Sequence, residues 1–123
     1  MIKITEYMSK PIISADNKDT IRDAVTKMAK HDIGSIIIVE NKKPIGIVTE
    51  RDILRVVAKK LDLDTPINKI MTKNVATVTE SATVIDIASL MKKRVVRRIV
   101  VVNKKGEVIG IVTSKDLIDI LCT

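Results

Sequence analysis

The chain has 123 residues, of which 46% are hydrophobic and 30% are charged, a balance that suits one compact domain or two small joined halves. Its 22 Lys and Arg residues against 15 Asp and Glu give a net charge of +7, which favours anionic partners such as nucleotide phosphates, nucleic acid or an acidic protein. With only one cysteine and one histidine, the sequence excludes an internal disulfide and a Cys/His metal cluster. It has no apolar run long enough to span a membrane and no apolar core of a signal peptide, so we expect a cytoplasmic protein.

The first predicted elements are a short extended piece at 12–14 and an amphipathic helix. Thr20 and Asp23 have the spacing of a capping box, in which the Thr caps the helix and the acidic side chain reaches back to the cap. The following residues repeat apolar side chains at i, i+3, i+4 and i+7, which predicts a helix packed on a flat surface. That apolar face consists of Ile21, Ala24, Val25, Met28 and Ala29.

A hairpin and a second helix complete this unit. Two β-branched runs, 36–39 and 44–48, flank a short polar turn, which favours an antiparallel hairpin whose strands are covered on both faces. Apolar spacing then predicts a closing helix over 50–61. A short linker containing Pro66 follows, over 62–69.

The chain then repeats itself at an offset of 63 residues, which becomes 64 after an insertion near Gly106. The second unit is predicted as an extended piece at 75–77, a helix capped by Thr83, strands at 99–102 and 108–112, and a helix at 114–121. The order is therefore β-α-β-β-α twice, with repeats at 1–61 and 70–123. Because a 60-residue unit buries little surface alone, we expect the copies to pack together and, by the same logic, the protein to form a homodimer.

Each repeat contains a G-x-x-T-x-x-D motif, at 46–52 and 110–116, where a strand runs into a helix. Such junctions gather free backbone N–H groups and a short polar side chain at one point. The Thr and Asp of each motif also fit a capping box. Two roles are thus open for Asp52 and Asp116, one as a helix cap and one as a ligand group.

The duplicated β-α-β-β-α unit with this motif resembles the CBS domain, named after cystathionine β-synthase, which occurs in tandem pairs called Bateman modules. The resemblance covers about 5–121 and includes the Met-Ser/Thr-Lys entries at 8–10 and 71–73. It implies an α/β (α+β) fold of two CBS repeats related by a pseudo-twofold axis. Unlike typical members, these residues include no enzyme, channel or transporter domain, so we expect a stand-alone regulatory module that signals to a separate partner.

The resemblance also implies a ligand: AMP, ADP, ATP or S-adenosylmethionine, bound in clefts between the repeats as a regulatory ligand rather than a required cofactor. Asp52 and Asp116 would accept hydrogen bonds from ribose hydroxyls, and Thr49 and Thr113 would touch ribose or phosphate. The remaining implied contacts are backbone at the adenine edge (Ile12, Ile13, Ser14, Val75, Ala76, Thr77), the ring neighbours Ile45 and Ile109, and Lys115.

Five basic residues fall within seven positions of the second repeat: Lys92, Lys93, Arg94, Arg97 and Arg98. Arginine suits phosphate because its planar fork donates two hydrogen bonds, and related CBS domains often carry His or Arg at the positions of Arg97 and Arg98. The alternative is a solvated helix end, where cations are favoured anyway. The first repeat has Gly34-Ser35 there, so we expect unequal affinities of the two clefts.

Other function classes have less support in the sequence. It shows no nucleophile–base pair, no metal-ligand spacing and no Walker-type loop, so we do not expect an enzyme. Nucleic-acid binding through 92–98 and the turn at 104–105 is the main alternative, although the chain lacks aromatic residues for base stacking. A third interpretation is a dimerisation module that is indifferent to ligands.

Overall fold

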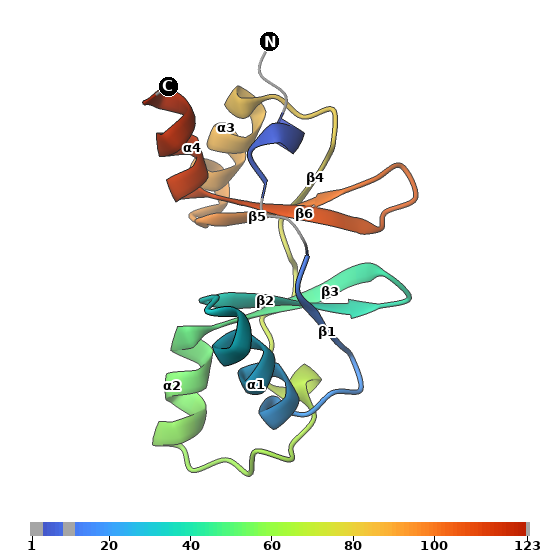
Figure 1. Cartoon of the computed structure of the whole chain (residues 1–123), viewed down its shortest axis with the longest axis vertical. Helices are drawn as coiled ribbons and strands as arrows, with labels where there is room; N and C mark the ends of the chain where they lie inside the picture. The colour runs from blue at the N-terminus through green and yellow to red at the C-terminus, as the bar shows by residue number, and fades with distance from the viewer. Residues whose placement is uncertain (1–3, 9–11, 123) are drawn as a thin grey trace. The chain divides into compact units, whose positions relative to one another are not determined.

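The computed structural model describes residues 4–8 and 12–122, which form two compact units (Figure 1). The first, Ile13–Val75, is called here the 13–75 unit; the second combines residues 4–8 and 12 with 76–122 and is called the 76–122 unit. Each unit holds a three-stranded sheet and two α-helices in the order β-α-β-β-α, which confirms the predicted class and repeat.

In the 13–75 unit the sheet order is β1-β2-β3, with β1 parallel and β3 antiparallel to β2. The helices α1 and α2 lie on one side of this sheet (Figure 1). Fully buried aliphatic residues of both helices and of β2 and β3 form the core. The elements are β1 (Ser14–Asp16), α1 (Ile21–His31), β2 (Ser35–Glu40), β3 (Lys43–Thr49), α2 (Glu50–Ala58) and the 3-10 helix η2 (Ile67–Lys69).

The 76–122 unit repeats this arrangement with the order β4-β5-β6. In both sheets the central strand supplies buried residues to the core of its own unit, Ile36 and Ile38 from β2 and Ile99 and Val101 from β5. The elements are the 3-10 helix η1 (Ile4–Glu6), β4 (Thr77–Thr79), α3 (Val84–Arg94), β5 (Arg98–Val102), β6 (Val108–Thr113) and α4 (Ser114–Leu121).

The segment that precedes each repeat packs in the core of the other repeat's unit. Ile67, which the sequence places in the linker, is 0% exposed in the core of the 13–75 unit, and its N–H donates to the Asp19 carbonyl at 2.8 Å. Its counterpart Ile4, 63 positions earlier, is 0% exposed in the core of the 76–122 unit. The compact units therefore differ from the sequence repeats: residues 63–75 belong to the first unit and residues 4–8 to the second.

Among the described residues, reciprocal capping boxes set the start of α1, α3 and α4. Asp23 N–H donates to Thr20 Oγ1 at 3.1 Å and Thr20 N–H donates to Asp23 Oδ2 at 2.9 Å, and Thr83 with Asp86 repeats the pattern. Both predicted boxes are confirmed. Hydrogen bonding from the Thr backbone stabilises the carboxylate and so lowers the pKa of Asp23 and of Asp86 below the ordinary 3.8.

Some predicted boundaries were wrong. The parallel edge strands begin and end two residues later than the apolar pieces at 12–14 and 75–77, because the pairing with the central strand covers 14–16 and 77–79 and so includes polar residues such as Asp16. The closing helix α2 ends at Ala58 rather than at 61. Lys60 adopts a positive φ of 56°, and Leu61 N–H bonds back to the Val56 carbonyl at 3.1 Å, so Leu61 continues the apolar spacing outside the helix.

A strained residue ends α3. Val95 has φ 53° and ψ 50° and is 89% exposed, whereas its counterpart at the end of α1, with nearly the same angles, is Asp32. A β-branched residue in this left-handed region is strained, whereas Asn and Asp tolerate it. We expect Val95→Asn to raise the free energy of unfolding by about 1 kcal/mol, measured by urea denaturation.

The reciprocal change is the control for this prediction. Asp32→Val should lower the free energy of unfolding by a similar amount, since it introduces the same strain at the end of α1. A Val95→Asn protein no more stable than the wild type would show that the left-handed conformation of Val95 carries no cost.

Candidate functional site

In the 76–122 unit the motif forms a strand–helix junction. Thr113 donates to Asp116 Oδ2 twice, from its backbone N–H at 2.8 Å and from its hydroxyl at 3.1 Å, while Asp116 N–H donates to Thr113 Oγ1 at 3.3 Å. The capping role that the sequence left open is therefore present. Asp116 Oδ1 takes no hydrogen bond from the described part of the chain, so it remains an available acceptor beside a helix N-terminus.

The 13–75 unit repeats this junction. Asp52 Oδ2 accepts from Thr49 N–H at 2.8 Å and from the Thr49 hydroxyl at 3.3 Å, and the Asp52 side chain is 11% exposed. Its Oδ1 lies 3.9 Å from an Arg55 guanidinium nitrogen. An ionised carboxylate offers about four lone-pair sites on two oxygens, so capping with Oδ2 is compatible with ligand binding through Oδ1.

Two arginines lie beside the junction of the 76–122 unit. Arg98 pairs with Thr113 across β5 and β6, and the Arg97 carbonyl accepts a hydrogen bond from Ser114 N–H at 2.9 Å. Arg97 is exposed and Arg98 half-buried, and neither forms an ion pair within the described residues. The fold thus gathers Arg97, Arg98, Thr113 and Asp116, with the exposed Lys115, at one end of the sheet.

The equivalent place in the 13–75 unit has Gly34 and Ser35 instead of the two arginines, and the acidic Glu50 beside them. Ser35 pairs with Thr49, and Glu50 N–H donates to the Gly34 carbonyl at 3.1 Å. A Cβ added to Gly34 would lie 2.7 Å from Glu50 Oε1, so the Glu50 carboxylate covers the position that Arg97 has in the other unit. An anion is therefore disfavoured at this junction relative to its counterpart.

The backbone groups predicted at the adenine edge lie at the edge strands. Ile12 and Ile13 precede β1 and are half-buried, and the Ser14 carbonyl accepts a hydrogen bond from Lys27 Nζ at 2.9 Å. In the other repeat Val75 is half-buried, the buried Ala76 accepts from Val100 N–H at 2.9 Å, and Thr77 begins β4. Of the predicted Met-Ser-Lys entry, only Met8 is described; residues 9 and 10 lie outside the described residues.

Ile45 and Ile109 sit apart from the junctions. Each is the extra residue of a β-bulge, because Ile38 pairs with Gly46 while Val39 pairs with Pro44, and β5 and β6 repeat the irregularity. Ile109 precedes Thr113 by four residues, about 13 Å along a strand. The structure does not bring these isoleucines to the Thr and Asp of the motif.

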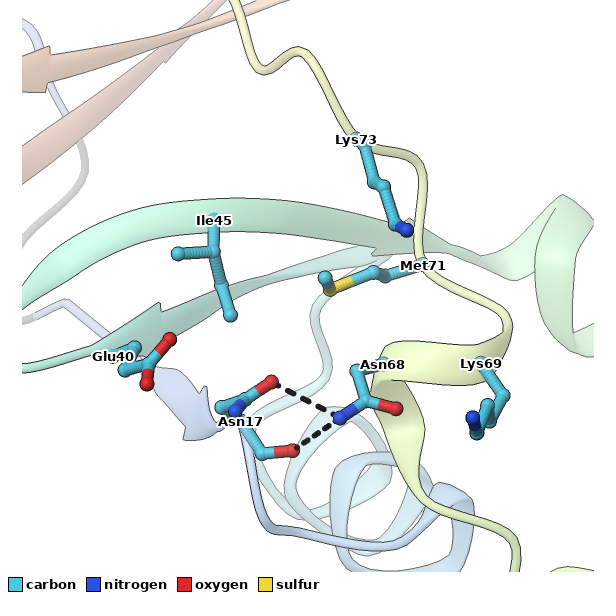
Figure 2. Close-up of a pocket in the computed structure, with 7 residues that line it drawn as sticks. All are labelled: Asn17, Glu40, Ile45, Asn68, Lys69, Met71 and Lys73. Atoms are coloured by element: carbon cyan, nitrogen blue, oxygen red, sulfur yellow. Dashed lines mark hydrogen bonds between the residues drawn. The ribbon is translucent and has the colours of Figure 1, made fainter.

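Ile45 instead lines a hollow of about 640 Å³ within the 13–75 unit (Figure 2). Asn68 Nδ2 donates to the Asn17 side-chain oxygen at 3.1 Å and to the Asn17 backbone carbonyl at 3.4 Å. The lining residues are Asn17, Glu40, Ile45, Asn68, Lys69, Met71 and Lys73. Sequence analysis missed the hollow because these residues come from four separate stretches of the chain and form no motif.

Comparison with known proteins connects the repeat to one family. The CBS domain model matches residues 4–59 and 67–123. An uncharacterised 17.7 kDa protein of Acidianus ambivalens is 31% identical over 94% of this chain. The chain spans 70%, 62% and 22% of the first three curated relatives that it matches.

Two similar solved structures contain adenosyl compounds. The CBS domain protein PAE2072 of Pyrobaculum aerophilum, in complex with AMP, has a TM-score of 0.86 and 33% identity, covering 99% of this chain and 100% of that one. The CBS domain pair of protein MJ0100, in complex with 5′-methylthioadenosine and S-adenosyl-L-methionine, has a TM-score of 0.87 and 32% identity, covering 99% and 97%.

Residues 4–8 and 12–122 lack two further features. None of the helices there has both the length and the hydrophobicity needed to cross a membrane. In the same ranges, no three His, Cys, Asp or Glu side chains are grouped so that they could hold a metal ion.

Proposed function

The chain belongs to the CBS domain family, and on that premise we propose that it is a regulatory module which binds an adenosyl ligand and signals its presence to a separate partner. The observation that carries the proposal is the junction of the 76–122 unit, where the Asp116 carboxylate and the Arg97–Arg98 pair lie together. The AMP and S-adenosyl-L-methionine complexes of similar proteins support an adenosyl ligand.

The chemistry of the junction matches the two polar parts of a nucleotide. A ribose diol presents two O–H donors, and Asp116 Oδ1 is an acceptor without a described partner. A phosphate presents oxygens that the guanidinium of Arg98 can bind in a bidentate manner, assisted by the N-terminus of α4. The ligand can change the signal only by binding one arrangement of the protein more tightly than another.

The first test is thermal melting with AMP, ADP, ATP, S-adenosylmethionine and a DNA duplex. The chain has no Trp, so the unfolding signal is read from an external dye. A ligand at about 100 times its dissociation constant should stabilise the protein by about 2.7 kcal/mol. Stabilisation by an adenosyl compound supports the proposal. A shift with DNA alone that declines steeply with salt would instead support nucleic-acid binding.

We expect the Arg98→Gln change to weaken AMP binding by about tenfold or more, measured by calorimetry, because a charge-assisted hydrogen bond to phosphate is lost. Adenosine, which lacks the phosphate, should bind the wild type and Arg98→Gln equally well. Asp116→Ala should weaken the binding of both AMP and adenosine. Lys104→Gln removes the same charge from an exposed turn and is the control. An equal loss in Lys104→Gln, or two equal AMP sites per chain, would contradict the assignment.

We also propose that the protein forms a homodimer through its closing helices. In α2, Leu54 and Val57 are 69% and 67% exposed, and their equivalents in α4, Ile118 and Leu121, are 59% and 81% exposed. Both repeats therefore leave the same apolar stripe uncovered within their own units, as expected for surfaces that pack against a second copy.

Light scattering should find a dimer for the wild type and a monomer for a Leu54→Glu/Ile118→Glu protein, since two buried charges without partners oppose association. Ile85→Glu is the matched control, because Ile85 is 77% exposed but lies on α3. A monomeric wild type at micromolar concentration, or dissociation by Ile85→Glu, would rule out this interface.

A further inference from the structure

The hollow of the 13–75 unit has charges and hydrogen-bonding groups without partners. Glu40, Lys69 and Lys73 line it, and none of the three forms an ion pair or a side-chain hydrogen bond within the described ranges. In Figure 2, Glu40 lies on the side of Ile45, and the two lysines lie on the opposite side. The hollow is therefore anionic at one end and cationic at the other.

A pair of amides lies between these ends. Asn68 uses its Nδ2 to bond to Asn17, which leaves the Asn68 carbonyl oxygen as an acceptor and the Asn17 Nδ2 as a donor without described partners. Ile45 and Met71, both half-buried, supply apolar surface beneath the strand β3 (Figure 2). Charged ends, a central amide pair and an apolar wall describe the complement of a short peptide.

We propose that this hollow binds a dipeptide with free termini. The Glu40 carboxylate receives the terminal ammonium, and Lys69 and Lys73 receive the terminal carboxylate. The charged termini of an extended dipeptide are about 7 Å apart, so they can reach opposite ends of the hollow. The charged groups of a single amino acid are attached to the same carbon atom and cannot. The peptide group between them bonds to the Asn17–Asn68 pair, and an aliphatic side chain packs on Ile45 and Met71.

The other repeat does not share this charge pattern, which makes it an internal reference. The position of Lys69 is occupied by Glu6, and that of Glu40 by Asn103. The Asn103 side chain is already engaged, with its Nδ2 donating to Glu107 Oε1 at 3.0 Å and its Oδ1 accepting from Glu107 N–H at 3.0 Å. One dipeptide per chain is the expected stoichiometry.

The experiment is calorimetry of the whole chain with alanyl-leucine at concentrations up to about 1 mM, alongside its N-acetylated and C-amidated forms. We expect the free dipeptide to bind, and each blocked form to bind at least about threefold more weakly. Glu40→Gln should abolish the preference for the free dipeptide over its N-acetylated form. Lys69→Gln/Lys73→Gln should abolish the preference for the free dipeptide over its C-amidated form. These side chains are exposed, so the variants should melt like the wild type.

Lys104→Gln/Lys105→Gln is the matched control, because both residues are exposed on a turn of the other unit. Absence of dipeptide binding, equal binding of the blocked peptides, or an equal loss in the control would each overturn the proposal. AMP should bind Glu40→Gln as it binds the wild type, so failure of the dipeptide site is distinguishable from failure of the nucleotide site.

Discussion

Replacing Ile4 by Ala is expected to lower the free energy of unfolding by about 2–5 kcal/mol, one of the largest effects of any single change in this chain. Ile4 is 0% exposed and packs in the cluster that contains Ile87, Ile99 and Val112. Truncation of its side chain leaves a cavity among residues that lie far from it in sequence. Urea denaturation gives the loss of stability.

Hydrogen exchange shows which of the two units loses stability. Ile4→Ala should speed exchange mainly in residues 76–122, and its counterpart Ile67→Ala mainly in residues 13–75, because each isoleucine belongs to a different core. Ile85→Ala, at a 77% exposed position, should change the stability by less than about 0.5 kcal/mol. If Ile4→Ala were as mild as Ile85→Ala, the N-terminal segment would not be part of the core.

Gly110→Ala should destabilise the protein by about 1–3 kcal/mol through a steric clash. A Cβ at Gly110 would meet the Sδ atom of Met8 and lie 2.7 Å from its Cγ. The same holds in the other unit, where a Cβ at Gly46 would meet Met71 Sδ and lie 2.7 Å from the Met71 Cγ. The overlap involves the stem of the methionine as well as its tip, so a small rotation does not relieve it.

A double-mutant cycle isolates this contact. In a Met8→Ala background, Gly110→Ala should cost much less than in the wild type, since the obstructing atoms are gone. Gly106→Ala is the control: Gly106 has φ +81° and nothing within 4 Å of an added Cβ, so its cost is backbone strain that Met8 does not affect. An unchanged cost of Gly110→Ala in both backgrounds would show that the close approach of Met8 is not the cause.

Much of the fold could be predicted because its signals are local. The Thr20–Asp23 box fixes the start of α1 within four residues, and the short polar turns fix the hairpins. The burial of Ile4 could not be predicted, since it depends on residues more than 80 positions away. Nor could the end of α2, because apolar spacing reports burial, whereas the helix ends through the left-handed conformation of Lys60.

The candidate site was predictable to a similar extent. The repeated motif indicated Asp116, the basic cluster and the family resemblance indicated Arg98, and the antiparallel register places Arg98 opposite Thr113. The carboxylate of Glu50 beside Gly34 was not predicted, because only that register brings together two residues 16 positions apart. The hollow was missed for the same reason, since its charges come from segments that meet only in the folded unit.

The packing of residues 4–8 in the 76–122 unit affects how the chain acquires its structure during synthesis. The 13–75 unit has all of its residues once position 75 has been added, whereas residues 4–8 must await β5, β6 and α4 of the other unit. At about 5–20 residues per second, the ribosome needs roughly 2–10 s to add residues 76–122. During that interval the apolar side chains of Ile4 and Met8 have no native partner, so residues 4–8 are open to chaperone binding and to proteolysis.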